Sequence, residues 1–439
     1  MRMINGLIQK DKELILQIYG ADENIVMDRA AGMYLYDTAG KGYLDFSGQF
    51  SACSLGHGNK EMIDAISHQM GKLLGVTSMF VTQERVRLAE QLLSISPPGL
   101  EKVMFGCTGS DANELALKIA KVWRGGGRFF SFRRGFHGST AGSAAATGKS
   151  ETIQGNPGIS ELLPRDFLHT SPPYCYRCDF DKTPDDCHFW CLRYLEQSLL
   201  HEGGDRIAGV ILEPILAAGG VIVPPPGFFH ELRRICDKFG ALLIYDEVVT
   251  GFGQTGKMFA LEHEGVEPDI LVVGKALTSG YIPGSAVIVG KDIGEKINGM
   301  TLHGHTHSCY PGMCAAASKN IEIILRDKLV ENAATVGTYL FNRLSDLKSR
   351  YAIIGDVRGK GLLLGIEIVQ DRVTKEAGHH IADNLYRKML TSGLITELES
   401  RENLQNSVIV LHPPLICSIR DADGAIVIIE EALSVVSKE

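Results

Sequence analysis

Short apolar runs separated by longer amphipathic segments fill the middle of the 439-residue chain and constrain its fold more than any other feature. Each run has about five residues and is rich in β-branched or aromatic side chains, as is typical of buried strands. The runs are Lys102–Gly106, Arg128–Phe132, Ile207–Leu212, Ala241–Tyr245, Ile270–Val273 and Ala286–Val289. The intervening segments predict helices at Asn113–Trp123, Phe228–Phe239 and Gly312–Arg326. This alternation predicts an α/β fold with a large, doubly wound and mostly parallel sheet.

The two ends of the chain follow a different pattern. Residues 24–46 alternate between apolar and polar side chains around two Ala-Gly turn signals, which predicts a small β-meander. Near the other end, Gly355–Val369 predicts strand, and Ala382–Thr391 and Asp421–Val436 predict helices.

This contrast between middle and ends predicts two domains. We expect residues 61–315 to form the large sheet domain. Residues 1–60 and 316–439 are expected to pack together as a smaller α+β domain built from both ends of the chain.

Composition and charge exclude several classes of protein. Lys and Arg total 44 and Asp and Glu total 52, so the formal net charge is −8, and no basic run occurs. We therefore expect no nucleic-acid partner and no membrane partner. The best apolar stretch for a membrane span, Gly209–Phe228, is interrupted by Glu213 and by several prolines and glycines. Met1–Lys12 has no signal-peptide core, and ten cysteines in so long a chain are no disulfide scaffold, so we expect a cytoplasmic protein.

The glycine-rich segment Gly251–Lys257 matches two nucleotide-binding patterns, but its context fits neither. A P-loop requires Ser or Thr after Lys257, where this chain has Met258. A dinucleotide fingerprint requires its glycines directly after a strand, but residues 246–250 intervene. We therefore interpret the segment as a glycine-rich loop that leaves a strand.

Polar residues follow two of the predicted strands, at the sheet edge where α/β proteins bind ligands. Thr108, Gly109 and Ser110 open a helix, where free N–H groups and the helix dipole favour a phosphate, although a plain helix cap is the alternative. Asp246 ends an apolar strand, and a carboxylate entering the sheet needs a cation such as a protonated pyridine nitrogen. An exposed acid at a strand end is the alternative for Asp246.

Lys275 follows a third strand, and burial there would lower the pKa of its amine and make it a usable nucleophile. The alternative is a solvated surface lysine. A phosphate cradle, an acid and a lysine in this order are what pyridoxal 5′-phosphate requires: an anchor, a partner for the electron sink and a Schiff-base amine. The sequence therefore predicts pyridoxal 5′-phosphate as the cofactor.

A series of motifs extends this pattern over nearly the whole chain. They are Tyr36–Asp45, Leu55–Gly58, Thr108–Ser110, Phe136–Gly138, Glu213–Ile215, Asp246–Gly253, Gly274–Leu277, His303–Thr306 and Gly355–Gly361. In these motifs the chain resembles the class III (ω-)aminotransferases, within the fold-type I pyridoxal-phosphate enzymes. The resemblance implies ping-pong transfer of an amino group from an amine or amino acid to a 2-oxo acid, either pyruvate or 2-oxoglutarate.

Carried over to matching positions, the resemblance implies roles around the cofactor ring. Lys275 would form the Schiff base and then shuttle the proton, and Asp246 would hold the pyridinium nitrogen. Val248 and Phe136 would pack on the two faces of the ring, and His137 belongs to the same cofactor-binding motif as Phe136.

The resemblance also implies how the phosphate is held. Gly109 and Ser110, together with Thr108, would bind it within one subunit. Thr306 would reach the phosphate of the neighbouring subunit, so the family's homodimer is implied, and a dimer of dimers is left open.

The subgroup within the family stays open. Ser47–Ala52 and Arg358–Gly365 look like 2,2-dialkylglycine decarboxylases, in which the glutamine matching Gln49 helps to aim a carboxylate for loss. Those enzymes carry an arginine shortly before a Pro-Pro-Leu motif, where this chain has Val410, so the α-carboxylate loses its usual clamp. The same departure is similar to amine:2-oxo-acid ω-transaminases.

Some of those ω-transaminases use a mobile arginine further upstream, and Arg401 is the nearest candidate, with an ordinary surface arginine as the alternative. Gln49 and Glu213 complete the expected substrate residues. A decarboxylating transaminase of the dialkylglycine type, or an amino-acid epimerase or racemase, remains an alternative on the same scaffold. Val249 and Gln254 depart from the family's usual glutamine and arginine near the cofactor.

Two clusters have a spacing that permits a metal site. Alternate histidines in His303–His307 would share one face of a strand, although the family motif already explains them. A polar insertion has a C-x2-C-x8-C-x3-C pattern, which permits tetrahedral zinc, with free or redox-labile thiols as the alternative. These cysteines are Cys175, Cys178, Cys187 and Cys191. We assign a metal to neither cluster.

Overall fold

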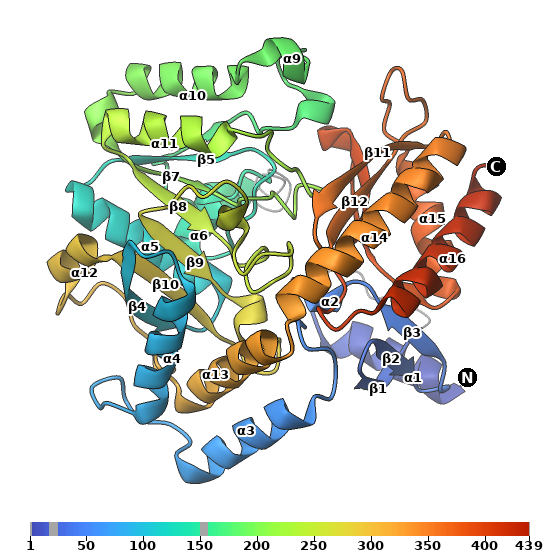
Figure 1. Cartoon of the computed structure of the whole chain (residues 1–439), viewed down its shortest axis with the longest axis horizontal. Coiled ribbons are helices and arrows are strands. Elements are labelled where there is room, and N and C mark those ends of the chain that lie inside the picture. Colours follow the sequence, from blue (N-terminus) through green and yellow to red (C-terminus); the bar gives the residue numbers. More distant parts are fainter. Residues whose placement is uncertain (1, 17–24, 150–156, 439) are drawn as a thin grey trace.

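A seven-stranded sheet forms the centre of the computed structural model, which describes residues 2–16, 25–149 and 157–438 (Figure 1). The strand order is β4-β10-β9-β8-β7-β5-β6. The strands are β4 (Leu100–Gly106), β5 (Arg128–Phe132), β6 (Phe167–Thr170), β7 (Ile207–Leu212), β8 (Leu242–Asp246), β9 (Ile270–Val273) and β10 (Ser285–Gly290). Only β10 runs antiparallel to its neighbours within this sheet. The predicted mostly parallel sheet is confirmed.

Helices cover both faces of this sheet, which explains why its central strands are apolar throughout. Alternate residues of β8 show the two faces. Leu242 and Ile244 pack with α5 (Gly109–Arg124), whereas Leu243 and Tyr245 pack with α11 (Phe228–Phe239). The doubly wound arrangement is therefore confirmed.

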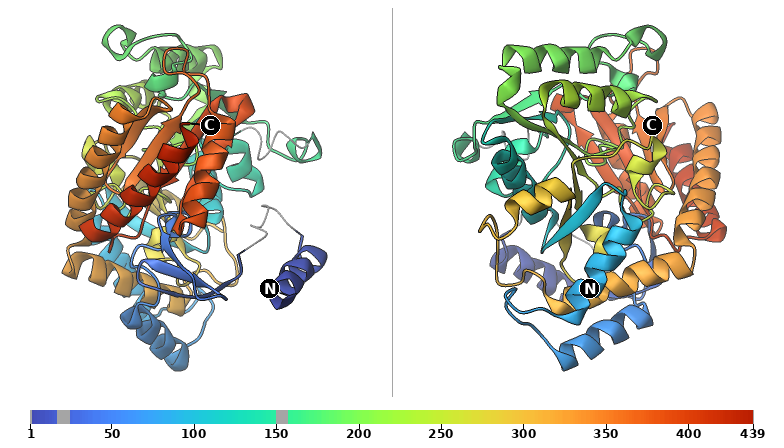
Figure 2. Two further views of the ribbon diagram at one scale, coloured as in Figure 1. Left: turned by 90° about the vertical axis from the view of Figure 1, so that its right-hand side faces the viewer. Right: turned by 60° about the vertical axis from the view of Figure 1, so that its left-hand side comes forward.

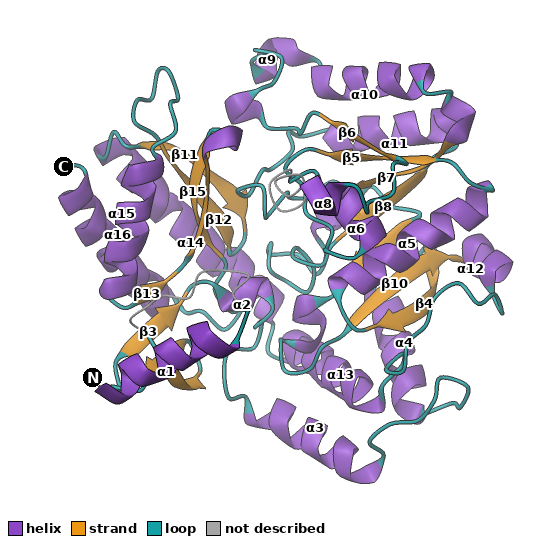
Figure 3. Ribbon diagram, turned by 180° about the vertical axis from the view of Figure 1, so that it is seen from behind, coloured by secondary structure: helices purple, strands orange, loops and turns teal. Residues whose placement is uncertain are grey.

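The helix predicted over Asn113–Trp123 begins earlier, at Gly109. The side chain of Thr108 accepts a hydrogen bond from the backbone N–H of Asp111, and this N-cap fixes the start of α5. The remaining helices near the large sheet are visible from behind in Figure 3. They are α3 (Lys60–Lys72), α4 (Gln83–Ile95), α6 (Ala141–Ala146), α8 (Pro157–Ser160), α9 (Pro184–Cys187), α10 (Trp190–His201), α12 (Lys291–Ile297) and α13 (Pro311–Arg326).

The glycine-rich loop after β8 leads into a short 3-10 helix, η3 (Ala260–His263), instead of the long helix that a nucleotide-binding loop precedes. Gly253 and Gly256 adopt left-handed backbone angles within this loop, with φ of 99° and 80°. The interpretation of Gly251–Lys257 as a loop that leaves a strand is confirmed.

The N-terminal strands form the expected meander and join a strand from the far end of the chain. β1 (Met27–Ala31), β2 (Tyr34–Asp37) and β3 (Gly42–Asp45) are antiparallel, and β3 pairs in parallel with β13 (Leu394–Ile395). Asn24, where the meander was expected to begin, lies outside the described residues. Figure 2 shows α1 (Arg2–Leu14) at the edge of the molecule, away from the main body.

A second four-stranded sheet lies in the C-terminal part, in the order β11-β12-β15-β14. Its elements are β11 (Ile354–Lys360), β12 (Leu363–Ile368), β14 (Glu397–Arg401) and β15 (Asn406–Leu411), packed with α14 (Leu329–Arg350), α15 (His379–Thr391) and α16 (Ile419–Val436). The strand structure predicted over Gly355–Val369 is confirmed, and it consists of two strands. That segment is a hairpin that turns at Gly361, where φ is 55° and the backbone of Thr255 and Gly256 leaves no room for a Cβ atom.

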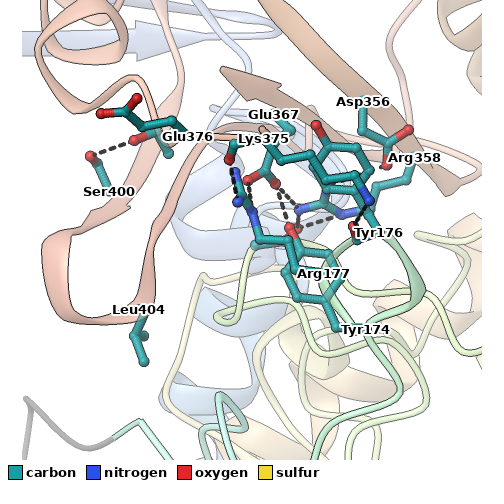
Figure 4. Close-up of polar contacts among 12 residues, drawn as sticks. Tyr174, Tyr176, Arg177, Asp356, Arg358, Glu367, Lys375, Glu376, Ser400 and Leu404 are labelled. Atoms are coloured by element: carbon teal, nitrogen blue, oxygen red, sulfur yellow. Dashed lines mark hydrogen bonds and ion pairs between the residues drawn. The ribbon is translucent and has the colours of Figure 1, made fainter. Parts of the chain in front are cut away.

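The insertion after β6 is fastened to this second sheet by a buried ion cluster (Figure 4). Glu367, on β12, is fully buried and accepts hydrogen bonds from the hydroxyl of Tyr174 and from Nε of Arg177, the latter at 2.9 Å. Arg358, on the neighbouring strand β11, lies 2.9 Å from the same carboxylate. Among the described helices, none is both long and apolar enough to cross a bilayer.

Candidate active site

Asp246 is the last residue of β8, and its buried carboxylate is held by three donors. Its Oδ2 accepts from Nδ2 of Asn113 at 2.7 Å and lies 2.8 Å from Nδ1 of His137. Its Oδ1 accepts from the backbone N–H of Val248 at 3.1 Å. The carboxylate therefore has a fixed orientation at the carboxyl edge of the sheet, where α/β proteins bind ligands.

Lys275 begins the 3-10 helix η4 (Lys275–Thr278) directly after β9 and has a left-handed φ of 41°. Burial lowers the pKa of its amine, and the negative charges of Glu397, Glu213 and Asp246 oppose that shift. Position and burial together suit this amine for nucleophilic attack.

The turn before α5 brings the backbone close to the side chain of Val248. A Cβ atom on Gly109 would lie 2.9 Å from Cγ1 of Val248, so only glycine fits there without a shift. A Cβ atom on Gly274, the residue before Lys275, would lie 3.4 Å from the same Cγ1. Val248 thus lies between the expected phosphate turn and the lysine strand.

A second close approach joins this turn to the Phe136–Gly138 motif. The hydroxyl of Ser110 accepts from the backbone N–H of Ser139 at 3.1 Å. A Cβ atom on Gly138 would lie 2.5 Å from that hydroxyl. The two predicted cofactor motifs, far apart in the sequence, are therefore adjacent in space.

Both carboxylate oxygens of Glu213 accept hydrogen bonds from backbone N–H groups, one of them that of Phe136. Its Oε1 accepts from the N–H of Phe136 at 2.9 Å, and its Oε2 accepts from the N–H of Ala217 at 3.1 Å. Burial raises the pKa of Glu213 to about 7. These contacts make Glu213 the support of the Phe136 loop, and its contact with substrate stays a prediction.

The residues around Asp246 and Lys275 fit pyridoxal 5′-phosphate on structural grounds. Oδ1 of Asn113 and Nε2 of His137 are buried beside Asp246 and have no hydrogen-bond partner among the residues that the structure describes. Buried polar atoms of this kind are costly unless a ligand or water meets them. A fixed carboxylate, a helix start with glycine turns and a buried amine match the ring nitrogen, the phosphate and the aldehyde of this cofactor.

Gln49 and Thr306 were predicted at the edge of the site. Oε1 of Gln49 lies 2.7 Å from the position that a Cβ atom on Gly280 would occupy, which places Gln49 against the segment after η4. Thr306 is exposed in the turn 306–309. Its contact with a neighbouring subunit stays a prediction.

Of the two clusters that permit metal by spacing, the histidines contact Asp111, whereas the four insertion cysteines lie close enough for their charges to interact with one another. Nε2 of His305 lies 2.9 Å from Oδ2 of Asp111, and Nε2 of His303 contacts the other oxygen of that carboxylate. The four insertion cysteines are free thiols, and burial raises the pKa of Cys191 to about 12. Over residues 2–16, 25–149 and 157–438, no group of three or more His, Cys, Asp or Glu side chains is placed to hold a metal ion.

Strand β14 carries Arg401, which the sequence predicted as a substrate residue, and two acids, Glu397 and Glu399, which it did not predict. Glu397, Glu399 and Arg401 alternate along it and share one face, because side chains of a strand alternate between faces. Nζ of Lys149 lies 2.8 Å and 2.7 Å from the two oxygens of Glu399. Burial raises the pKa of Glu399, and the positive charge of Arg401 opposes that shift. A role of Arg401 toward substrate stays a prediction. The sequence signal for this strand face is the alternation of charged residues in Glu397-x-Glu399-x-Arg401.

Comparison with known proteins agrees with this geometry. The family model described as aminotransferase class-III matches residues 18–433. The leucine/methionine racemase of Thermococcus litoralis is 35% identical, over 93% of this chain and 90% of that protein. The taurine–pyruvate aminotransferase of Bilophila wadsworthia is 35% identical, over 95% of this chain and 94% of that protein. The (S)-enantioselective ω-transaminase of Thermomicrobium roseum superposes with a TM-score of 0.90 at 34% identity, covering 98% of each chain.

The resemblance inferred from the sequence motifs is confirmed by the family match, and so are the fold and the cofactor. Membership of the family does not determine which amino donor and which acceptor the enzyme uses. The chain belongs to the class III aminotransferases and is a pyridoxal-phosphate-dependent aminotransferase.

Proposed function

We propose that the protein transfers an amino group from an amine without an α-carboxylate to a 2-oxo acid, pyruvate or 2-oxoglutarate. One observation carries this choice of donor. Val410 stands on β15 where a carboxylate-binding arginine is expected, and the residue directly opposite it on β14 is Glu397. A carboxylate finds no charge-assisted clamp there and meets an anion instead. The name of the taurine–pyruvate relative supports pyruvate as the acceptor.

The described residues suggest how the cofactor is held. Asp246 would face the ring nitrogen, Phe136 and Val248 would lie on the two faces of the ring, and Gly109 and Ser110 would bind the phosphate. When bound, pyridoxal 5′-phosphate supplies an aldehyde that captures amines and a ring that withdraws electrons from the attached carbon.

Lys275 performs the proton chemistry in this proposal. Its buried amine is neutral for a larger fraction of the time than that of a solvated lysine, because burial disfavours the charged form. Nζ can therefore take the proton from the carbon that bears the donor's amine and would deliver it to the aldehyde-derived carbon of the cofactor, and the half-reaction with the 2-oxo acid would reverse this transfer. Asn113 and His137 keep Asp246 oriented throughout.

We further infer the assembly, the location and the domain division of the protein. The exposed turn that carries Thr306 supports a homodimer, with a dimer of dimers left open. All ten cysteines are free thiols, which supports the reducing cytoplasm. The pairing of β3 with β13 supports a small domain made from residues 1–60 and 316–439, beside a large domain at residues 61–315.

The test is formation of alanine from pyruvate and n-pentylamine by the cofactor-loaded enzyme, followed by chromatography. We expect alanine with the native enzyme and none with Lys275→Ala. If alanine forms only from α-amino acids, the proposed donor class is wrong. If carbon dioxide is released from α-aminoisobutyrate instead, the enzyme is a decarboxylating transaminase.

Racemisation is a second candidate, because the leucine/methionine racemase is among the similar relatives. A racemase would exchange the α-hydrogen of an amino acid for solvent deuterium and lose chirality without any oxo acid. Incubation of L-leucine or L-methionine in deuterium oxide, followed by chiral chromatography and mass spectrometry, distinguishes the two activities. We expect no racemisation, because Glu397 and Val410 give the α-carboxylate no cation.

A further inference from the structure

A cavity of about 360 Å³ lies where the glycine-rich loop after β8 meets the second sheet and its helix α14. Its walls come from residues 255–263 of the loop, residues 334–341 of α14 and residues 359–364 of the β11–β12 hairpin. Neither Asp246 nor Lys275 lines it. We call it the hairpin cavity, and it is a second site, apart from the one expected to hold the cofactor.

Two lysines give the hairpin cavity its charge. Lys257 ends the glycine-rich segment that the nucleotide-binding patterns do not explain, and Lys360 ends β11. Neither amine forms a hydrogen bond or an ion pair with another residue that the structure describes. Among the described residues that line the cavity, none is an acid. The cavity therefore carries two positive charges that the protein does not neutralise locally.

His263 shows that both charges act within the same small volume. Burial, and then the positive charges of Lys360 and Lys257, lower the pKa of this ring to about 4. Nε2 of His263 lies 3.2 Å from both the carbonyl oxygen and the hydroxyl of Thr255. Two amines from distant parts of the chain thus act on one neutral ring, and a concave wall concentrates their field on an anion.

The walls are held by close backbone contacts that do not involve the lysines. A Cβ atom on Gly361 would lie 2.5 Å from the backbone nitrogen of Gly256, and one on Gly337 would have no room beside Gly361. The N–H of Leu362 donates to the carbonyl oxygen of Gln254 at 2.9 Å. The packing of these segments fixes the backbone positions from which the two lysines extend, so the site is preorganised.

The remaining wall is hydrocarbon. Ala334 and Phe341 contribute from α14, and the buried Leu364 contributes from β12. Phe341 is partly buried against the main core. An anion that carries an apolar or aromatic body would therefore contact apolar surface on one side and ammonium groups on the other.

We propose that the hairpin cavity binds a small organic phosphate, with its phosphate between Lys257 and Lys360 and its apolar body against Phe341. Ammonium groups are donors only, and phosphate oxygens are strong acceptors, so the two match in charge and in hydrogen bonding. The site differs from a P-loop, because Met258 follows Lys257 and the loop leads into η3 and not into a long helix.

The test is calorimetric titration of the cofactor-loaded enzyme with phenyl phosphate, inorganic phosphate and phenol at constant ionic strength. We expect phenyl phosphate to bind once per chain, inorganic phosphate to bind more weakly, and phenol to bind at least about 10-fold more weakly than phenyl phosphate. The absorbance of the bound cofactor should stay constant, which shows that its own phosphate site remains filled. The result does not depend on which donor the enzyme uses, because only binding is measured.

Two outcomes of this titration would contradict the proposal. If phenyl phosphate shows no saturable binding, the site does not exist. If inorganic phosphate binds as tightly as phenyl phosphate, the cavity takes a free phosphate and the contact with Phe341 is wrong.

Lys257→Gln and Lys360→Gln test the placement of the phosphate. Each should weaken phenyl phosphate about 10-fold or more, because each removes hydrogen bonds from a charged donor. Lys291→Gln is the matched control, since Lys291 is an exposed lysine at the start of α12, and its affinity should equal that of the native enzyme. Unchanged affinity in both cavity variants, or an equal loss in the control, overturns the assignment. The three titrations of the native enzyme test the site even if a variant fails to fold.

Discussion

Two carboxylates of the same four-stranded sheet have opposite surroundings. Glu367 on β12 is bound by Tyr174, Arg177 and Arg358. Oε1 of Glu397, on β14, forms an ion pair with Nε2 of His412 at 3.0 Å, and among the described residues it accepts no well-aligned hydrogen bond. A carboxylate whose oxygens accept several well-aligned hydrogen bonds contributes more to the fold than one whose contact is not aligned as a hydrogen bond.

The position of each residue explains the difference. Glu367 lies where three segments meet, because Arg358 also donates to the carbonyl oxygens of Gly220 and Val221, at 3.0 Å each from Nε. Its cluster therefore joins the insertion, the second sheet and the loop after β7 (Figure 4). Glu397 instead lies near enough to Lys275 for its charge to raise the pKa of that amine, and its side chain is 20% exposed.

Glu367→Ala should produce the largest loss of stability. Removing this carboxylate leaves two buried arginines without their anion, so we expect the free energy of unfolding to fall by about 3–5 kcal/mol. Urea denaturation at fixed protein and cofactor concentrations measures it. Glu376→Ala, at an exposed acid of the same region, is the control. A loss of under about 1 kcal/mol would contradict a structural role for the cluster.

Glu213→Gln should alter how stability depends on pH. Its folded-state pKa is raised to about 7, so its stabilising contribution is complete below its ordinary pKa and is lost as pH rises through about 7. Glutamine does not titrate. The melting temperature of the variant relative to the native enzyme should therefore rise from about pH 5 to about pH 8. A constant difference across this range would place the pKa of Glu213 near its ordinary value.

Glu397→Gln should leave stability nearly unchanged, in contrast to Glu367→Ala. Because Oε1 of Glu397 has only a poorly aligned contact with His412 among the described residues, we expect a change within about 0.5 kcal/mol. The same urea series measures it. Destabilisation as large as that of Glu367→Ala would mean that Glu397 is a structural residue, and the contrast between the two carboxylates would fail.

Lys60→Ala should have the smallest effect and sets the lower limit of the series. Lys60 and Asp64 form an exposed pair one helical turn apart, with side-chain exposures of 83% and 61%. Solvent and salt screen such a pair, so we expect a change of at most about 0.5 kcal/mol. A larger effect that disappears in high salt would show that surface charges also contribute to this fold.

The sequence predicted elements that carry their own local signal. The large sheet was predictable because its strands are continuous apolar runs, and Asp246 and Lys275 because each follows such a run directly. Asn113, Lys149, Glu397 and His412 gave no comparable signal. Their contacts join residues far apart in the chain, such as Asn113 with Asp246 and Lys149 with Glu399. Only the fold determines such pairs.

The turn at Gly361 was not predicted, for a different reason, whereas the helix start at Thr108–Ser110 was predicted from its residue types and not from periodicity. Gly361 interrupts a run that reads as one strand, and its turn is required by the nearby backbone of Thr255 and Gly256. Thr108 begins its helix earlier than the apolar periodicity indicates, because capping depends on one side-chain hydrogen bond. Element boundaries therefore depended on contacts that periodicity does not record.

The pairing of β3 with β13 has a consequence for biosynthesis. Leu44 pairs with Leu394, so the partner of β3 leaves the ribosome 394 − 44 = 350 residues later. At about 5–20 residues per second, β3 would keep an unpaired edge for on the order of 20–70 seconds. Such an edge can pair with other chains, so the nascent N-terminal meander is a point at which a chaperone would protect this protein.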